Sequence, residues 1–68
     1  MKKLISVVTP CYNEEDNVEK LIELVKKEFD SMPQYDYEHI FIDNCSTDNT
    51  VAILRHCAQA NKHVKVIL

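Results

Sequence analysis

Apolar and polar positions along the chain follow two patterns, one with strand character and one with helical character. Residues 4–9 are rich in β-branched side chains and almost continuously apolar, which is typical of a parallel strand buried on both faces. A longer stretch then repeats apolar residues every three or four positions, which predicts an amphipathic helix. Residues 38–43 and 64–68 repeat the strand pattern, and residues 49–60 repeat the helical one. The chain is therefore predicted to have the element order β-α-β-α-β.

The first helix is the element that this pattern defines best. Its apolar stripe recurs at i, i+3, i+4, i+7 and i+11, and consists of Val18, Leu21, Ile22, Val25 and Phe29. We expect Pro10 to end the preceding strand and Asn13 to cap the helix, with Asp16 as the partner in a weak capping box. Pro33 prevents the helix from continuing through residues 30–36, which form a linker.

The second helix has polar signals at both ends. Ser46 or Asp48 is expected to cap its start, and Asn61 is expected to end it in a left-handed conformation. The positions that this helix is expected to bury are Val51, Leu54, Cys57 and Ala58.

The element order predicts an α/β fold. Right-handed crossovers place the three strands in a parallel sheet of order 3-2-1, which is one Rossmann-like half of a larger fold. The outer edge of the first strand then has no neighbour. An exposed apolar strand edge favours self-association, so we expect this edge to pair with a second copy.

Composition narrows the classes of protein to which the chain can belong. Its 68 residues allow one small domain, and such a chain buries only about 60% of its unfolded surface. A net charge of −3 with interspersed signs provides no basic stripe for nucleic acid. P-loop ATPases and dinucleotide enzymes are excluded because their phosphate loops need glycine, and this chain has none. Cys11, Cys45 and Cys57 lack C-x-x-C spacing and are interpreted as reduced thiols rather than a disulfide framework or zinc site.

Two polar segments follow the first two strands. Residues 10–14 and residues 43–48 are expected to converge at the carboxyl edge of the sheet, where open α/β folds bind ligands. The ring of Tyr12 could stack against a flat base whose edge bonds to Asp43, Asn44 or Glu14. This edge is therefore the predicted ligand site.

The same two segments carry a resemblance to a known family. Residues 5–14, ISVVTPCYNE, and residues 41–50, FIDNCSTDNT, resemble the opening of the family 2 glycosyltransferases. They are most similar to the bacterial branch that transfers a sugar from a nucleotide diphosphate to a polyprenyl phosphate, the relatives of dolichol-phosphate mannosyltransferase. The resemblance covers essentially all of this chain but only the first part of such an enzyme.

The resemblance implies a GT-A fold in which these segments hold a nucleoside-diphosphate sugar donor. The residues that it assigns to the donor are Pro10, Tyr12, Asn13, Glu14, Asp43 and Asn44. Asn44 replaces an acid that is frequent in the family; it keeps an acceptor for an imide N–H but removes a charge. Cys45 replaces a glycine or other small residue, and it lacks the freedom of glycine at positive φ.

The resemblance also implies a divalent cation, Mg²⁺ or Mn²⁺, held by a D-x-D motif after a fourth strand, and a carboxylate base in inverting members. Two segments here have acid-x-acid spacing, residues 36–38 and residues 14–16. The first lies at the amino end of its strand and the second begins a helix, so neither is assigned to a metal. No residue of this chain is assigned a catalytic role.

We therefore expect residues 1–68 to be the N-terminal nucleotide-binding part of a glycosyltransferase domain, inactive in transfer by itself. The expected acceptor is a polyprenyl phosphate or a glycan, bound by other parts of the enzyme. The expected location is the cytoplasm, with the longer enzyme on the cytoplasmic face of the inner membrane.

Simpler interpretations of the same residues stay open. Asp43 could satisfy the amides that follow it, Asp48 could act only as a cap, and Tyr12 could be a packing residue. The histidines are scattered and are interpreted as structural or surface residues; they are His39, His56 and His63. The alternative function is a non-catalytic α/β interaction module that associates through its exposed strand edge. A receiver domain is disfavoured because Thr9, Pro10 and Cys11 stand where an acid cluster would be needed.

Overall fold

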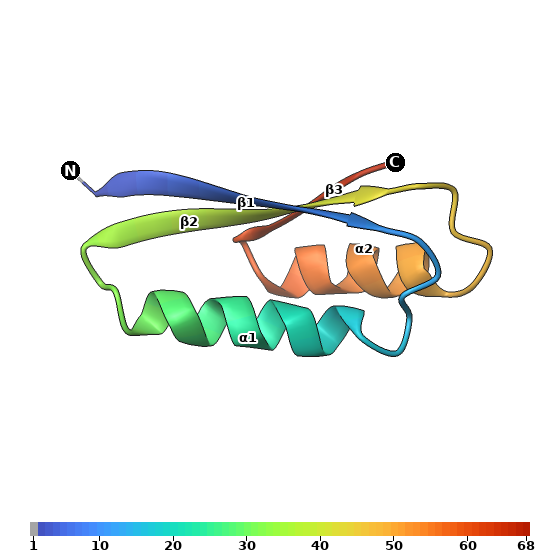
Figure 1. Cartoon of the computed structure of the whole chain (residues 1–68), viewed down its shortest axis with the longest axis horizontal. Helices are drawn as coiled ribbons and strands as arrows, with labels where there is room; N and C mark the ends of the chain where they lie inside the picture. Colours follow the sequence, from blue (N-terminus) through green and yellow to red (C-terminus); the bar gives the residue numbers. More distant parts are fainter. Residues whose placement is uncertain (1) are drawn as a thin grey trace.

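The computed structural model describes residues 2–68 and confirms the predicted element order (Figure 1). The elements are β1 (Lys3–Cys11), α1 (Val18–Asp30), β2 (Tyr35–Asp43), α2 (Thr50–Ala60) and β3 (Val64–Ile67). Two loops matter for the site described below. Loop 1 is residues 12–17, between β1 and α1, and loop 2 is residues 44–48, between β2 and α2.

The three strands form a parallel sheet in the order β1-β2-β3, which is the predicted neighbour order. Lys3 lies opposite Tyr35 at one end of the β1–β2 pair, and Cys11 lies opposite Asp43 at the other. Both helices cover the same face of the sheet (Figure 1). This arrangement follows because two right-handed crossovers that advance in the same direction return to the same side. This topology is consistent with the expected N-terminal half of a GT-A fold.

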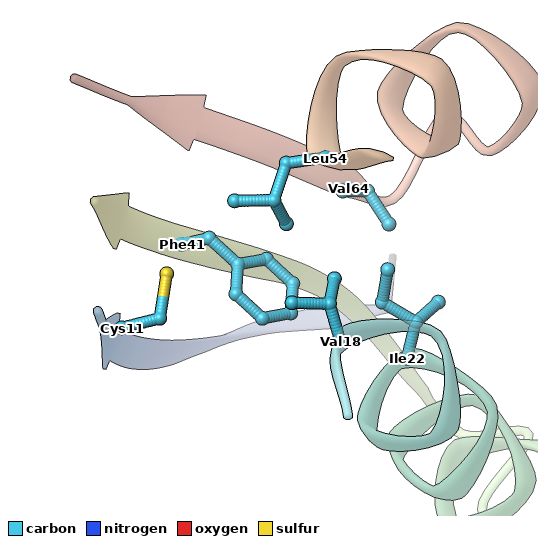
Figure 2. Packing of buried hydrophobic residues seen from close by; sticks show 6 residues of the cluster. All are labelled: Cys11, Val18, Ile22, Phe41, Leu54 and Val64. Atoms are coloured by element: carbon cyan, nitrogen blue, oxygen red, sulfur yellow. The ribbon is translucent and has the colours of Figure 1, made fainter. Parts of the chain in front are cut away.

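A small core fills the space between the sheet and the two helices (Figure 2). The ring of Phe41 from β2 lies at its centre and is fully buried, as is Leu54 from α2. Val18 and Ile22 approach from α1, as the apolar stripe of that helix predicted. Burying side chains of this size contributes about 1.5–3 kcal/mol each, so this cluster carries much of the stability of the chain.

The other face of the sheet is uncovered in the part of the chain that the structure describes. Burial alternates along β1, and Leu4 and Val8 are 56% and 54% exposed. Ile42 of β2 and Ile67 of β3 are also exposed. The prediction that residues 4–9 are buried on both faces is therefore wrong, because both helices lie on one side.

The start of α1 also differs from the prediction. Asn13 does not cap the helix: residues 14–17 form a turn in which the Glu14 carbonyl accepts from the Asn17 and Val18 amides at 2.9 and 3.0 Å. Asn17 occupies the N-cap position without a side-chain cap hydrogen bond. Pro10 does not end β1 but lies within it. Its missing N–H is tolerated because β1 is an edge strand.

The ends of α2 differ from both predictions. The N-cap position is Asn49, without a side-chain cap hydrogen bond, so neither Ser46 nor Asp48 occupies it. Asp48 still contacts the start of the helix, since its Oδ1 accepts from the Thr50 amide at 2.9 Å. Asn61 has a φ of −133°, so the predicted left-handed C-cap is wrong. Its Oδ1 instead accepts from the His63 amide at 2.9 Å and closes the turn into β3. No helix within residues 2–68 has the length and apolar character to cross a membrane.

Candidate functional site

Loop 1 and loop 2 leave neighbouring strands at the same edge of the sheet. Cys11 and Asp43 are paired at the carboxyl ends of β1 and β2. The Asn44 amide donates to the Cys11 carbonyl at 2.9 Å and continues the strand pairing into loop 2. The predicted convergence of the two segments is therefore present in the structure.

Asp43 is buried at the base of this edge, with 8% of its surface exposed. Its Oδ2 accepts from the Ser46 amide at 3.0 Å, and its Oδ1 accepts from the Ser46 hydroxyl. The Cys11 thiol lies 3.8 Å from the same Oδ1. Asp43 thus satisfies groups of the following turn, which is the simpler interpretation given above. A carboxylate has about four lone-pair sites, so one further acceptor position is left for a ligand.

Two non-glycine residues at this edge have left-handed backbone conformations, Asn13 with a φ of 50° and Cys45 with a φ of 57°. Asparagine visits this region readily, whereas a cysteine there carries strain of the order of 1 kcal/mol. Cys45 therefore adopts the conformation for which a glycine would be suited. The turn is retained without glycine because neighbouring hydrogen bonds hold it in place.

The side chain of Asn13 joins loop 1 to loop 2. Its Oδ1 accepts from the backbone amides of Thr47 and Asp48 at 2.8 and 3.3 Å. Its Nδ2 donates to the Thr47 hydroxyl at 3.2 Å. Its own backbone amide donates to the Ser46 hydroxyl at 3.0 Å. Asn13, which was predicted to cap the first helix, therefore bonds to loop 2 instead.

Two further contacts link the residues after Asn13 to the start of α2. The Glu14 amide donates to the Thr50 hydroxyl at 2.9 Å, and the Glu15 amide donates to Asp48 Oδ2 at 3.4 Å. Thr50 is fully buried. We call the set formed by Asn13, Ser46, Thr47, Asp48 and Thr50 the loop network. Sequence analysis did not assign the hydroxyl-bearing members to the site, although the short polar run at residues 46–50 could have indicated them.

The other predicted donor residues lie around this network on the surface. Tyr12 is 53% exposed, and Pro10, Glu14 and Asn44 are exposed as well. Pro10 and Glu14 line a cavity of about 210 Å³ between the end of β1 and α1, whereas Tyr12 and Asp43 do not line it. A larger, shallow hollow is formed by residues of α1 alone, away from both loops. The cavity beside β1 is therefore the one that belongs to this edge.

The electrostatic character of the edge is acidic. Burial, together with the nearby Asp43 carboxylate, raises the pKa of the Cys11 thiol. Burial would raise the pKa of Asp48, but hydrogen bonds from Thr50 and Glu15 outweigh it and lower that pKa. Neither loop contains a lysine or arginine. Among residues 2–68 no group of three metal-ligating side chains is assembled.

Comparison with known proteins identifies the family. The model of the family described as "Glycosyl transferase family 2" matches residues 6–68. The putative glycosyltransferase CsbB of Bacillus subtilis is 42% identical over 64 residues, which cover 94% of this chain and 19% of that protein. The putative teichuronic acid biosynthesis glycosyltransferase TuaG of the same organism is 36% identical over 66 residues, covering 97% of this chain and 25% of that protein.

A third relative comes from a different organism. The undecaprenyl-phosphate 4-deoxy-4-formamido-L-arabinose transferase of Edwardsiella ictaluri is 39% identical over 57 residues, which cover 84% of this chain and 17% of that protein. The chain thus spans a quarter or less of the length of these three relatives. With the family model matching nearly its whole length, the chain belongs to glycosyl transferase family 2.

Proposed function

We propose that this chain binds the nucleotide of a nucleoside-diphosphate sugar at the edge formed by loop 1 and loop 2. The observation that supports this is the position of Tyr12 directly after Cys11, which is the strand partner of Asp43. An exposed ring and a carboxylate on adjacent strand ends provide a stacking surface and a hydrogen-bond acceptor for a base. Asn44, next to Asp43, adds an amide that can accept from and donate to the edge of the base.

We propose that residues beyond this chain supply the groups that act on the diphosphate. Residues 2–68 present no assembled set of metal ligands, and the two loops carry no basic side chain. These residues do not fit a Mg²⁺ or Mn²⁺ site, so the cation expected for the family would be held by residues beyond this chain. We therefore expect nucleotide binding without sugar transfer from the 68 residues alone.

The acceptor that we propose is a polyprenyl phosphate. The support is the similarity to a relative named as an undecaprenyl-phosphate sugar transferase. A glycan acceptor is the other form of this proposal. The free thiols Cys11, Cys45 and Cys57 are typical of a reducing compartment, so we place the chain in the cytoplasm, with the longer enzyme at the inner membrane.

The site proposal is tested by titrating UDP and GDP into ¹⁵N-labelled chain and following the amide resonances. The resonances of Tyr12, Asp43 and Asn44 should shift, with a Kd of about 1 mM because only part of a donor pocket is present. Tyr12→Ala should weaken binding about tenfold, since base stacking on an aromatic ring contributes about 1–3 kcal/mol. Tyr12→Phe keeps the ring and should bind like the unmodified chain.

Tyr35→Ala is the matched control, because Tyr35 lies at the opposite end of β2. It should leave the Kd of the folded chain unchanged. Shifts that avoid Tyr12 and Asp43, or equal losses for Tyr12→Ala and Tyr35→Ala, would contradict the assignment of the site.

A second candidate function is association with another copy of the chain. It is favoured by the outer edge of β1, which has no neighbouring strand in the described sheet, and by the exposed Leu4 and Val8 on that strand. Sedimentation velocity should then show a mass that rises with concentration, and Val8→Lys should reduce this rise. A monomer at every concentration would count against it.

A further inference from the structure

We propose that Asn13 is a positioning residue, which holds Tyr12 and Glu14 beside Asp43 without touching the nucleotide itself. This inference rests on the proposed nucleotide site. Asn13 lies between the two exposed residues of loop 1 that are assigned to the donor. Whatever fixes its backbone therefore fixes the direction in which both neighbours leave the chain.

The amide group of Asn13 is already occupied by loop 2. Oδ1 accepts from the Thr47 and Asp48 backbone amides, which can only donate, so the oxygen of Asn13 must be the atom that faces them. The Thr47 hydroxyl lies 3.4 Å from the same oxygen. A side-chain carbonyl has two lone pairs, and the two backbone amides use both. The Nδ2 atom already donates to Thr47 Oγ1. Little hydrogen-bonding capacity is left for a ligand.

A second chain of contacts connects Asn13 to Asp43. The Asn13 backbone amide donates to the Ser46 hydroxyl, and that hydroxyl donates to Asp43 Oδ1. The carboxylate proposed to meet the base and the segment that carries Tyr12 thus share one hydroxyl group. A displacement of loop 1 would change the bonding of Asp43 as well.

The contacts of Asn13 select one of several backbone conformations. Asparagine adopts a φ of 50° readily, but it also populates the right-handed helical and extended regions, so residue type alone does not fix this turn. Neither Tyr12 nor Glu14 is buried, so packing does not hold this turn. The hydrogen bonds of the loop network are therefore what keeps Tyr12 and Glu14 at the sheet edge, and pre-organisation of this kind raises affinity by removing an ordering cost.

The experiment compares UDP binding by the unmodified chain, Asn13→Gly, Asn13→Asp and Asn49→Ala. Glycine tolerates the positive φ, so Asn13→Gly removes the side-chain contacts without adding backbone strain. The Kd should rise about tenfold, because the ordering cost that the side-chain contacts of Asn13 remove would then be incurred on binding. Asn13→Asp keeps an oxygen facing both amides and should restore the Kd to within about threefold.

Asn49→Ala is the matched control, because Asn49 is an adjacent asparagine whose side chain makes no cap hydrogen bond to α2. It should leave the Kd unchanged. Binding is followed on resonances of the folded chain, so a change in stability alone does not alter the fitted Kd. Amide exchange supplies a second measurement: the Thr47 and Asp48 amides should exchange about tenfold faster in Asn13→Gly only.

The possible results separate this inference from the function on which it rests. If the unmodified chain shows no shifts at Tyr12 and Asp43, the proposed function fails and the inference fails with it. If the unmodified chain binds and Asn13→Gly binds equally well, the site stands and the positioning role is overturned. Failure of Asn13→Asp to restore binding would also overturn it, because the acceptor oxygen would then not be the important group.

Discussion

The two ends of the sheet are held together in different ways. At the amino end, three aromatic rings stack in sequence: Phe29 on Tyr37 with ring centroids 4.4 Å apart, and Tyr37 on His63 with centroids 4.1 Å apart. His63 Nδ1 also donates to the Tyr37 carbonyl at 2.8 Å. At the carboxyl end, the loops are joined by hydrogen bonds among short polar side chains, of which Asn13 and Thr47 are exposed.

This difference separates stability from recognition. Stacked rings bury apolar area and gain about 0.5–1.5 kcal/mol for each pair beyond that area, so they stabilise the fold. The hydrogen bonds of the loop network contribute about 0.5–1.5 kcal/mol each without burying a comparable apolar area, and they fix direction. The carboxyl end, where hydrogen bonds orient the loops, is also the end at which parallel α/β sheets bind ligands. Substitutions at the two ends should therefore affect different measurements.

The largest effect should come from Tyr37→Ala at the amino end. Tyr37 is 8% exposed and contacts rings on both sides. Its truncation should cost about 3 kcal/mol of unfolding free energy, because it leaves a cavity and removes both stacks. Urea denaturation followed by circular dichroism measures this loss. The Kd for UDP in the remaining folded fraction should not change.

Tyr37→Phe is the control for this experiment, since it keeps both stacks and should stay close to the unmodified stability. The comparison between the two ends would be broken if Tyr37→Ala weakened nucleotide binding by folded molecules. It would also be broken if this variant lost no more stability than Tyr35→Ala, which truncates a half-buried ring at the start of the same strand.

A smaller effect on the free energy of unfolding should come from lowering the pH, through His39 in the middle of β2. His39 is 1% exposed, its Nε2 lies 2.9 Å from Thr9 Oγ1, and its ring packs on Phe41. Burial lowers the pKa of this histidine below its ordinary value of 6.5. Above pH 6.5 both folded and unfolded chains keep it neutral. Below that value His39 binds a proton in the unfolded chain but not in the folded chain, so the free energy of unfolding falls with falling pH.

The expected slope is at most about 1.4 kcal/mol per pH unit, from pH 6.5 down to the lowered pKa. Urea titrations between pH 7 and pH 5 measure it. His39→Gln can still bond to Thr9 but does not titrate in this range, so its stability should change less with pH. Equal slopes for both chains would show that His39 does not carry the effect.

The sequence was sufficient to predict whatever depends on local periodicity. The apolar stripe of α1, the strand order and the meeting of the two loops all follow from spacing and handedness, and the structure confirms them. The cap of α1 could not be predicted correctly. Asn13 has the right residue type and spacing for a cap, but its amide is used by Thr47, which lies 34 residues away. The capping rule considers only neighbouring residues, so it could not anticipate a contact that forms only in the folded chain.

The same limit applies at the other positions where prediction and structure differ. The stacking of Tyr37 on His63 joins residues that no local pattern relates. Leu4 and Val8 are exposed because both helices lie on the same side of the sheet (Figure 1). The assignment of Tyr12 and Glu14 to a nucleotide stays a prediction until binding is measured. The polar residues after each strand indicated where a site should be, whereas its shape depends on side-chain contacts between residues that are distant in the sequence.

The smallest effect should come from Cys45→Gly at the carboxyl end. Cys45 has a φ of 57°, and glycine would remove the steric cost of that conformation. Part of the gain is offset because glycine loses more backbone entropy on folding, so the net stabilisation should be about 0.5 kcal/mol. Asn44→Gly is the control, since the φ of Asn44 is not positive and glycine there should be destabilising. Urea denaturation of both variants measures the difference. If Cys45→Gly also loses stability, the strain is not in this turn, and the hydrogen bonds of the loop network alone would determine its conformation.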